Sequence, residues 1–246
     1  MSAARANAEL FTGGVRAVRR AAMWWGIGIS FFSLLNIAFW PMLESSDALS
    51  ELDEVPEGML EAFGAQNLAT PAGYLDGQLY ALMLPLLLSG LAIAVVTAIT
   101  SGDEHAGRLE LVHASPVSRR AVWLLRLASS LVAVLAVAMV TSVAIGVAVR
   151  VFSLDGVTVL RVCSVTLACG LLAAFHAAVA YAVGAFGASR GASVGAGVLA
   201  LLGGYVLDFL VPLVRGGGAA RNASPWYWAI GQQPSPRSCA LRCCSW

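Results

Sequence analysis

The chain has 246 residues, of which 59% are hydrophobic and only 12% are charged, and its mean hydropathy is +0.78. Soluble domains carry about 25% charged residues, so this composition indicates a membrane protein. The formal charge is +1, which gives no basic footprint for a nucleic-acid partner. The sequence contains no lysine. The chain therefore cannot form a phosphate-binding loop of the Walker type, and any ATP it depends on must be hydrolysed by another protein.

Five stretches have the length and apolar character of membrane-spanning helices, which need about 20 residues. They cover roughly residues 21–40, 79–100, 121–149, 157–186 and 192–214. Pro41 is expected to end the first stretch, and the two longest stretches are expected either to tilt in the bilayer or to lie partly in the interface. The fold class is predicted to be all-α and polytopic, with five transmembrane helices.

The arginines predict the orientation, because short loops rich in Lys or Arg stay in the cytoplasm. The leader 1–20 and the loop 101–120 carry arginines, whereas the loop 41–78 has eight acids and no arginine. We therefore expect a cytoplasmic N-terminus and an outer acidic loop. Within that outer loop, residues 57–64 are predicted to form a short surface helix.

The residues after the fifth stretch fall into two parts. Residues 215–233 are predicted to form an outer loop in which Trp226, Tyr227 and Trp228 suit the water–lipid interface. Residues 234–246 read PSPRSCALRCCSW. This segment has no apolar period, and its three cysteines lack the four-ligand spacing of a zinc site, so we expect an aberrant tail and no metal.

The loop 101–120 is the most informative part of the sequence. Asp103 and Glu104 are predicted to open a short amphipathic helix, and Pro116 is predicted to end it before Arg119. A solvated loop that obeys the positive-inside rule explains the same residues equally well.

A pattern of the form acid-x-x-G-x-L-(E/D)-L…P-V-S-R is formed in this loop by Glu104, Gly107, Leu109, Glu110, Leu111, Pro116, Val117, Ser118 and Arg119. It resembles the loop between the second and third helices of type 2 ABC transporter permeases. Three further segments, PEGMLEAFG, TPAGYLDGQLYALMLPLLL and SPWYWAIGQQP, resemble actinobacterial members that export antibiotics or polyketides. Together these segments extend the resemblance over most of residues 55–234.

The resemblance implies partners as well as a fold. The loop would carry a coupling helix that docks on a separate ATP-binding cassette subunit, where ATP and Mg would bind, so this chain itself would hold no cofactor. A transporter would contain two six-helix halves, either identical or different. The coupling residues would be Glu104, Gly107, Arg108, Leu109, Glu110, Pro116 and Arg119. The family continues into a sixth helix where this sequence has its tail, which predicts a truncation or a frame change after Gln233.

Polar groups inside the spans are functional candidates, because they are costly in hydrocarbon. Asp208 is expected to line a translocation path or to pair with Arg215 or Arg161. His176 is expected to form a hydrogen bond across helices or to lie on the same path. Arg126 is expected to extend its side chain to the cytoplasmic surface.

Ser193 lies in a G-x-S-x-G sequence, which is the pattern of a hydrolase nucleophile. A serine nucleophile needs a base, and the membrane-embedded histidine, His176, precedes it in the chain. Glycines four residues apart on this helix are instead interpreted as a close packing face: Gly187, Gly191 and Gly195.

These patterns together predict the transmembrane subunit of an ATP-binding cassette exporter in a bacterial plasma membrane. Its cargo is expected to be a hydrophobic, antibiotic-like molecule, and no enzymatic activity is expected of the chain itself. Two alternatives stay open: an intramembrane serine hydrolase that uses Ser193, and a non-transporting membrane scaffold. The helices themselves identify neither the cargo nor the direction of transport.

Overall fold

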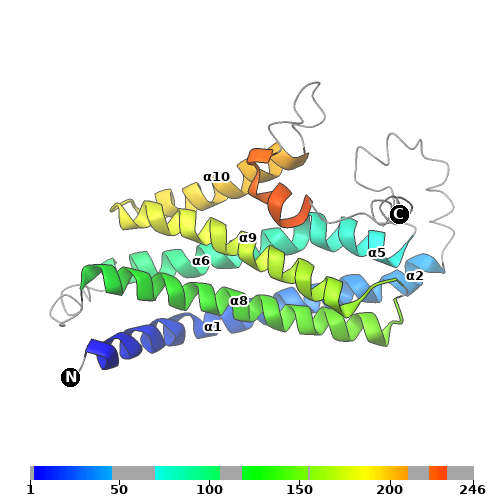
Figure 1. Cartoon of the computed structure of the whole chain (residues 1–246), viewed down its shortest axis with the longest axis horizontal. Helices are drawn as coiled ribbons and strands as arrows, with labels where there is room; N and C mark the ends of the chain where they lie inside the picture. The colour runs from blue at the N-terminus through cyan, green and yellow to red at the C-terminus, as the bar shows by residue number, and fades with distance from the viewer. Residues whose placement is uncertain (1–2, 46–69, 106–117, 155, 210–221, 232–246) are drawn as a thin grey trace, which may run out of the picture.

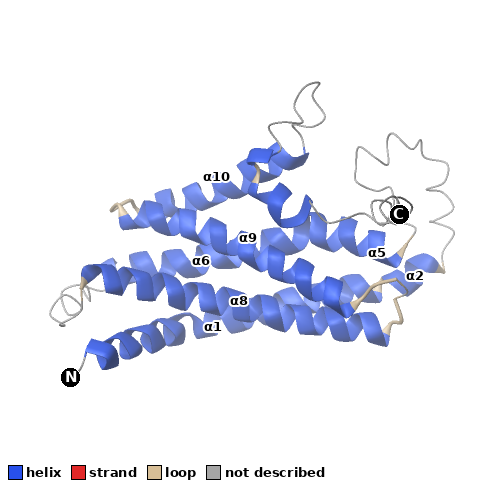
Figure 2. Cartoon of the chain, in the orientation of Figure 1, coloured by secondary structure: helices blue, strands red, loops and turns tan. Residues whose placement is uncertain are grey.

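The computed structural model describes residues 3–45, 70–105, 118–154, 156–209 and 222–231. These residues form helices and short turns, with no strand among them (Figure 2). The long helices are α1 (Ala3–Ala38), α6 (Leu84–His105), α8 (Arg119–Val151), α9 (Val159–Ala185) and α10 (Arg190–Phe209). The short ones are α2 (Trp40–Glu44), α5 (Pro71–Tyr74) and the π-helices η1 (Leu75–Met83) and η4 (Tyr227–Gly231). The short helix predicted at residues 57–64 and the predicted tail lie outside the described residues.

Five helical stretches in the described part are long and apolar enough to cross a membrane, which confirms the predicted fold class. They are Arg5–Glu44, Pro71–Thr100, Arg120–Val151, Val159–Ala185 and Arg190–Phe209. The second is a continuous run of α5, η1 and α6.

The first two stretches begin earlier than the sequence pattern predicted. Helix α1 begins at Ala3 rather than near residue 21, because the alanines and arginines of the leader favour a helix even where the segment is polar. Pro41 does not end the helical stretch; it occupies the first turn of α2, where its missing N–H has no partner to lose. The second stretch begins at Pro71, so the outer loop predicted over residues 41–78 is helical at both ends.

Four helical segments begin after a Ser or Thr whose side chain accepts a hydrogen bond from the backbone N–H three residues later. These capping residues are Thr70, Ser118, Thr158 and Ser189, with N–O distances of 3.1 to 3.3 Å. Such caps satisfy N–H groups that have no partner within the helix. At the other end of α9, Gly187 has a φ of +82°, the left-handed conformation that commonly follows a helix C-terminus.

The helices form a bundle with α6 in contact with α1, α8, α9 and α10 (Figure 1). Helix α9 lies between α8 and α10, and α1 packs along α8. We name the end of the bundle that holds the N-terminus of α1 the N-terminal end. The C-terminus of α6 and the N-terminus of α8 also lie there, whereas α2, α5 and the α8–α9 turn lie at the opposite end.

Helix α10 packs through a face that differs from the predicted one. Its buried residues recur every three or four positions, as expected of one helix face: Ser193, Gly197, Leu201, Gly204 and Asp208. A β-carbon added at Gly197 would lie 2.9 Å from Ile93 of α6, whereas one added at Gly191 or Gly195 would meet no described atom within 4 Å. The packing face predicted from Gly187, Gly191 and Gly195 is therefore wrong within this chain, because these glycines point away from α6 and α9.

The aromatic patch predicted for the outer loop is divided by the fold. Trp226 is buried against α10, where its ring covers Gly204 so closely that an added β-carbon would lie 2.8 Å from Trp226 Cδ1. Ser224 fixes this contact by donating a hydrogen bond of 2.7 Å to the Gly204 carbonyl. Trp228 is exposed, as a residue at the water–lipid interface would be.

Candidate functional site

Three pairs of polar side chains join the stretch α5–η1–α6 to α9. Their sequence separations are 85, 86 and 87 residues. A nearly constant separation means that the two stretches run in the same direction, since antiparallel helices would instead keep the sum of the residue numbers constant. The pairs are Asp76–Arg161, Tyr80–Thr166 and Ser89–His176. We name this row the polar seam.

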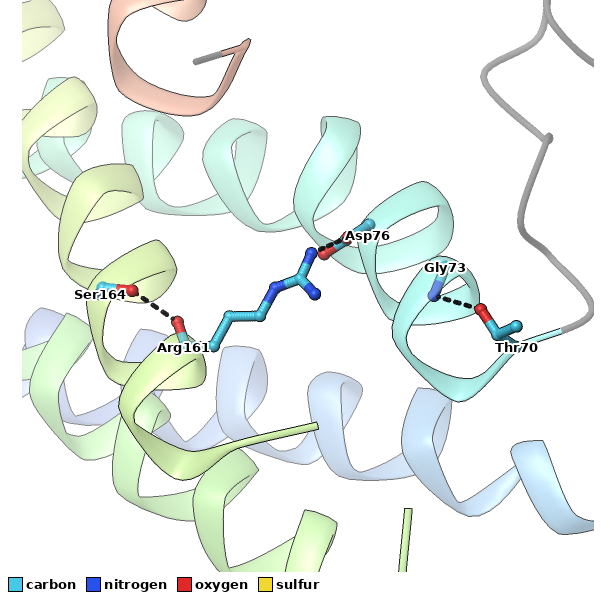
Figure 3. A network of polar contacts seen from close by, with 5 residues as sticks. All are labelled: Thr70, Gly73, Asp76, Arg161 and Ser164. Atoms are coloured by element: carbon cyan, nitrogen blue, oxygen red, sulfur yellow. Dashed lines mark hydrogen bonds and ion pairs between the residues drawn. The ribbon is translucent and has the colours of Figure 1, made fainter. Parts of the chain in front are cut away.

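The first pair of the seam is an ion pair near the opposite end of the bundle (Figure 3). Asp76 lies on η1 and Arg161 lies in the first turn of α9. Thr158 caps α9 by accepting from the Arg161 N–H, and the Ser164 hydroxyl donates to the Arg161 carbonyl at 2.9 Å. The backbone of Arg161 is thus held on both sides, and its guanidinium reaches Asp76 on η1.

This ion pair bears on one of the three alternatives predicted for Asp208, the pairing with Arg161. Arg161 pairs with Asp76 rather than with Asp208, and Arg215 lies outside the described residues. Asp208 is buried on the packed face of α10. From the sequence, Asp76 was expected only as one of the acids in the outer loop. The signal that it missed is that Asp76 lies within a helical stretch, where a carboxylate normally needs a partner.

The second and third pairs lie deeper in the bundle and are fully buried. The Tyr80 hydroxyl and Thr166 Oγ1 are 3.4 Å apart, and Ser89 Oγ lies 2.9 Å from His176 Nδ1. The hydrogen bond predicted for His176 across helices is thereby confirmed, with a partner that the sequence did not indicate. The other ring nitrogen of His176, Nε2, has no hydrogen-bond partner among the described residues.

The structure does not bring Ser193 and His176 together. Ser193 is buried and its hydroxyl donates to the Ser189 carbonyl at 3.2 Å. It packs beside Gly184, which is eight residues beyond His176 on α9 and therefore about 12 Å along the helix axis. A nucleophile and its base must lie within hydrogen-bond reach, so this geometry gives the serine-hydrolase alternative no support.

Arg126 also differs from its prediction. Its side chain is buried in the bundle rather than extended to the surface. The carbonyl of Arg126 accepts hydrogen bonds from Ser129 and Ser130, at 2.9 and 3.0 Å. The turn around Arg126 therefore belongs to the packed interior of α8, which explains why the side chain does not project outward.

The segment predicted to couple to an ATPase is bracketed by two helices at the N-terminal end of the bundle. Glu104 lies in the last turn of α6, so Asp103 and Glu104 continue that helix rather than opening a new one. Arg119 is the first residue of α8, after the Ser118 cap. The predicted coupling residues between these helices lie outside the described residues: Gly107, Arg108, Leu109, Glu110 and Pro116.

An apolar groove of about 450 Å³ runs between α1 and the η1–α6 stretch. It is lined by Trp24, Trp25, Gly28, Ile29, Phe32, Met83 and Leu87. No pattern in the sequence indicated this groove. The ring of Trp25 lies beside Gly90, near the middle of the stretch 71–105. Helix α1 begins about 20 residues before this tryptophan, so Trp25 lies well inside the helix rather than at its start.

These features define the class as a multi-pass membrane protein whose helices bury polar groups between them. Within the described part, no cluster of residues could hold a metal ion. The family model described as "Multidrug efflux system permease Rv1217c, C-terminal domain" matches residues 13–237, a range that reaches all five spans. The chain belongs to this family of multidrug efflux permeases. No curated protein and no solved structure matches the chain.

Proposed function

We propose that this chain is the transmembrane subunit of an ATP-binding cassette exporter that moves a hydrophobic, drug-like molecule across the plasma membrane. The observation that carries the proposal is its membership of a multidrug efflux permease family over all five spans. The absence of lysine supports a separate ATPase subunit, because a Walker loop needs that residue. ATP and Mg would then bind on the partner.

The N-terminal end of the bundle would face the cytoplasm and receive this partner. Arg16, Arg19 and Arg20 are exposed on α1 near that end, as the positive-inside rule expects. The segment 106–117 joins α6 to α8 at the same end. A displacement of this segment by the ATPase would therefore act on two spans at once, as a coupling element requires.

A second permease half would complete the transporter. The matching family is described as the C-terminal domain of a permease, which fits a chain that corresponds to one half of a larger transporter. The outward faces of α1 and α10 carry exposed apolar side chains, so they are available to lipid or to the second half. The apolar groove between α1 and α6 supports a hydrophobic cargo, because ligand sites of this size are mostly apolar with aromatic lining.

The proposal predicts that charge reversal next to the coupling segment uncouples the transporter. The full chain is co-expressed with the ATPase encoded nearest to it, and ATP hydrolysis stimulated by a hydrophobic dye is measured in proteoliposomes. Glu104→Lys and Glu110→Lys should each reduce the stimulation at least about fivefold, the lower end of typical coupling between sites. Both variants should insert into the membrane normally, because neither substitution removes an apolar span.

A matched control is Glu9→Lys, which reverses an exposed acid on α1 at the same end of the bundle. This control should keep full stimulation. If Glu104→Lys and Glu110→Lys both kept full stimulation as well, the coupling role of this segment would be contradicted.

A further inference from the structure

The polar seam changes character along its length. Tyr80, Thr166, Ser89 and His176 are all buried. The side chains of Asp76 and Arg161 are instead 43% and 29% exposed. The ion pair is therefore the boundary between the buried polar row and the surroundings of the bundle at the opposite end.

The helix that carries Asp76 needs support from its surroundings. Element η1 is a π-helix of nine residues, whereas π-helices are mostly single turns and are often found at functional sites. Its N-terminal side is fixed by the Thr70 cap, and its partner Arg161 is fixed by the capped first turn of α9. The ion pair is a direct link between these two fixed points.

Directly behind the ion pair lies the next rung of the seam. The Tyr80–Thr166 contact is one turn further along η1 and is long for a hydroxyl pair, at 3.4 Å. This rung alone would hold the helices weakly. If Asp76 and Arg161 separated, both charges would need water, and the water would reach the Tyr80 hydroxyl first.

We propose that the Asp76–Arg161 ion pair is a latch that closes the seam between η1 and α9, and that breaking the pair opens the seam to water. A partly exposed ion pair is weak enough to open reversibly. The inference deepens the proposed function, because an exporter must open on the side opposite its ATPase. Seam opening is measured below without ATP or cargo, so its failure is distinguishable from failure of the exporter assignment.

Cys169 is a native reporter for the opening. It is fully buried on α9, eight residues or about 12 Å beyond Arg161 and three residues beyond Thr166, the partner of Tyr80. A reporter chain keeps Cys169 and replaces the other cysteines by serine: Cys163, Cys239, Cys243 and Cys244. The full chain is placed in lipid nanodiscs, where both faces are accessible, and is treated with a charged, membrane-impermeant methanethiosulfonate.

The latch predicts faster labelling of Cys169 when the pair is broken. Asp76→Asn and Arg161→Gln should each raise the labelling rate about two- to fivefold, the change in an opening equilibrium that corresponds to about 0.4 to 1 kcal/mol. The double neutralisation Asp76→Asn/Arg161→Gln should do the same and is the safer variant to fold, because it leaves no uncompensated charge. The charge swap Asp76→Arg/Arg161→Asp should return the rate toward that of the parent.

Two controls separate seam opening from general loosening. Arg150→Gln removes an exposed charge from the last turn of α8 at the same end of the bundle and should leave the rate unchanged. A chain that keeps the exposed Cys163 instead of Cys169 should label equally fast in every variant. The latch is overturned if the double neutralisation labels Cys169 at the parental rate, or if the charge swap labels as fast as the neutral variants.

Discussion

The α6–α9 seam and the outward faces of α1 and α10 show two different uses of an apolar helix. In the seam, each polar side chain has a partner on the neighbouring helix of the same chain. At least half of the most apolar segment of each seam-forming span is buried. In the spans of α1 and α10, only 28% of the most apolar segment is buried. Helix α9 carries the polar row although it is more apolar on average than α10. Average hydropathy therefore separates the more buried spans from the two less buried ones, but it does not indicate where polar pairs lie within the buried spans.

The strongest test of this difference is to crowd the buried face of α10. Gly197→Val would push a side chain into Ile93 and Ala180, and overpacking of this kind costs about 1 to 3 kcal/mol. The melting temperature of the detergent-solubilised chain should fall by about 3 to 10 °C. The matched control is Gly203→Val on the same helix, whose β-carbon would meet no described atom within 4 Å. A fall of equal size in both variants would contradict the assignment of the packed face.

A smaller effect is expected from the deepest pair of the seam. A double-mutant cycle of Ser89→Ala and His176→Phe should show a coupling free energy of about 0.6 to 1.7 kcal/mol, the average and the maximum measured for hydrogen bonds between membrane helices. The same cycle at Ser30 and Thr141, a partly buried contact of 3.3 Å between α1 and α8, should give less. Coupling that is absent at Ser89–His176 or stronger at Ser30–Thr141 would remove the distinction between the seam and the periphery.

The part of the fold that was predictable follows from local rules. Apolar length predicted five spans, and Ser or Thr before a helical stretch marks four of the observed starts. The start of α1 was not predictable from hydropathy, because its first turns are helical by residue preference rather than by burial. The choice between Gly191 and Gly197 as the packed glycine was also hidden, since both belong to small-residue patterns and only the neighbouring helices decide which face is covered.

The candidate site was predictable only in part. His176 was identified because a buried imidazole needs a partner, but Ser89 lies 87 residues away and no local pattern indicates it. Arg161 was one of the two partners expected for Asp208, because both are charges within spans. The residue that pairs with Arg161, Asp76, was assigned to a loop because the start of the second span was placed too late. The coupling motif was recognised from its resemblance to a family, and the residues in its centre lie outside the described part of the chain.

Export itself gives the most direct test of the central claim. Inside-out membrane vesicles that contain this chain and its ATPase should accumulate a fluorescent hydrophobic dye when ATP is added. Vesicles that contain either protein alone, or the chain with Glu104→Lys together with the ATPase, should accumulate little, because the chain supplies the path and the ATPase supplies the energy. Equal ATP-dependent accumulation in vesicles that lack this chain would contradict its assignment as the permease subunit.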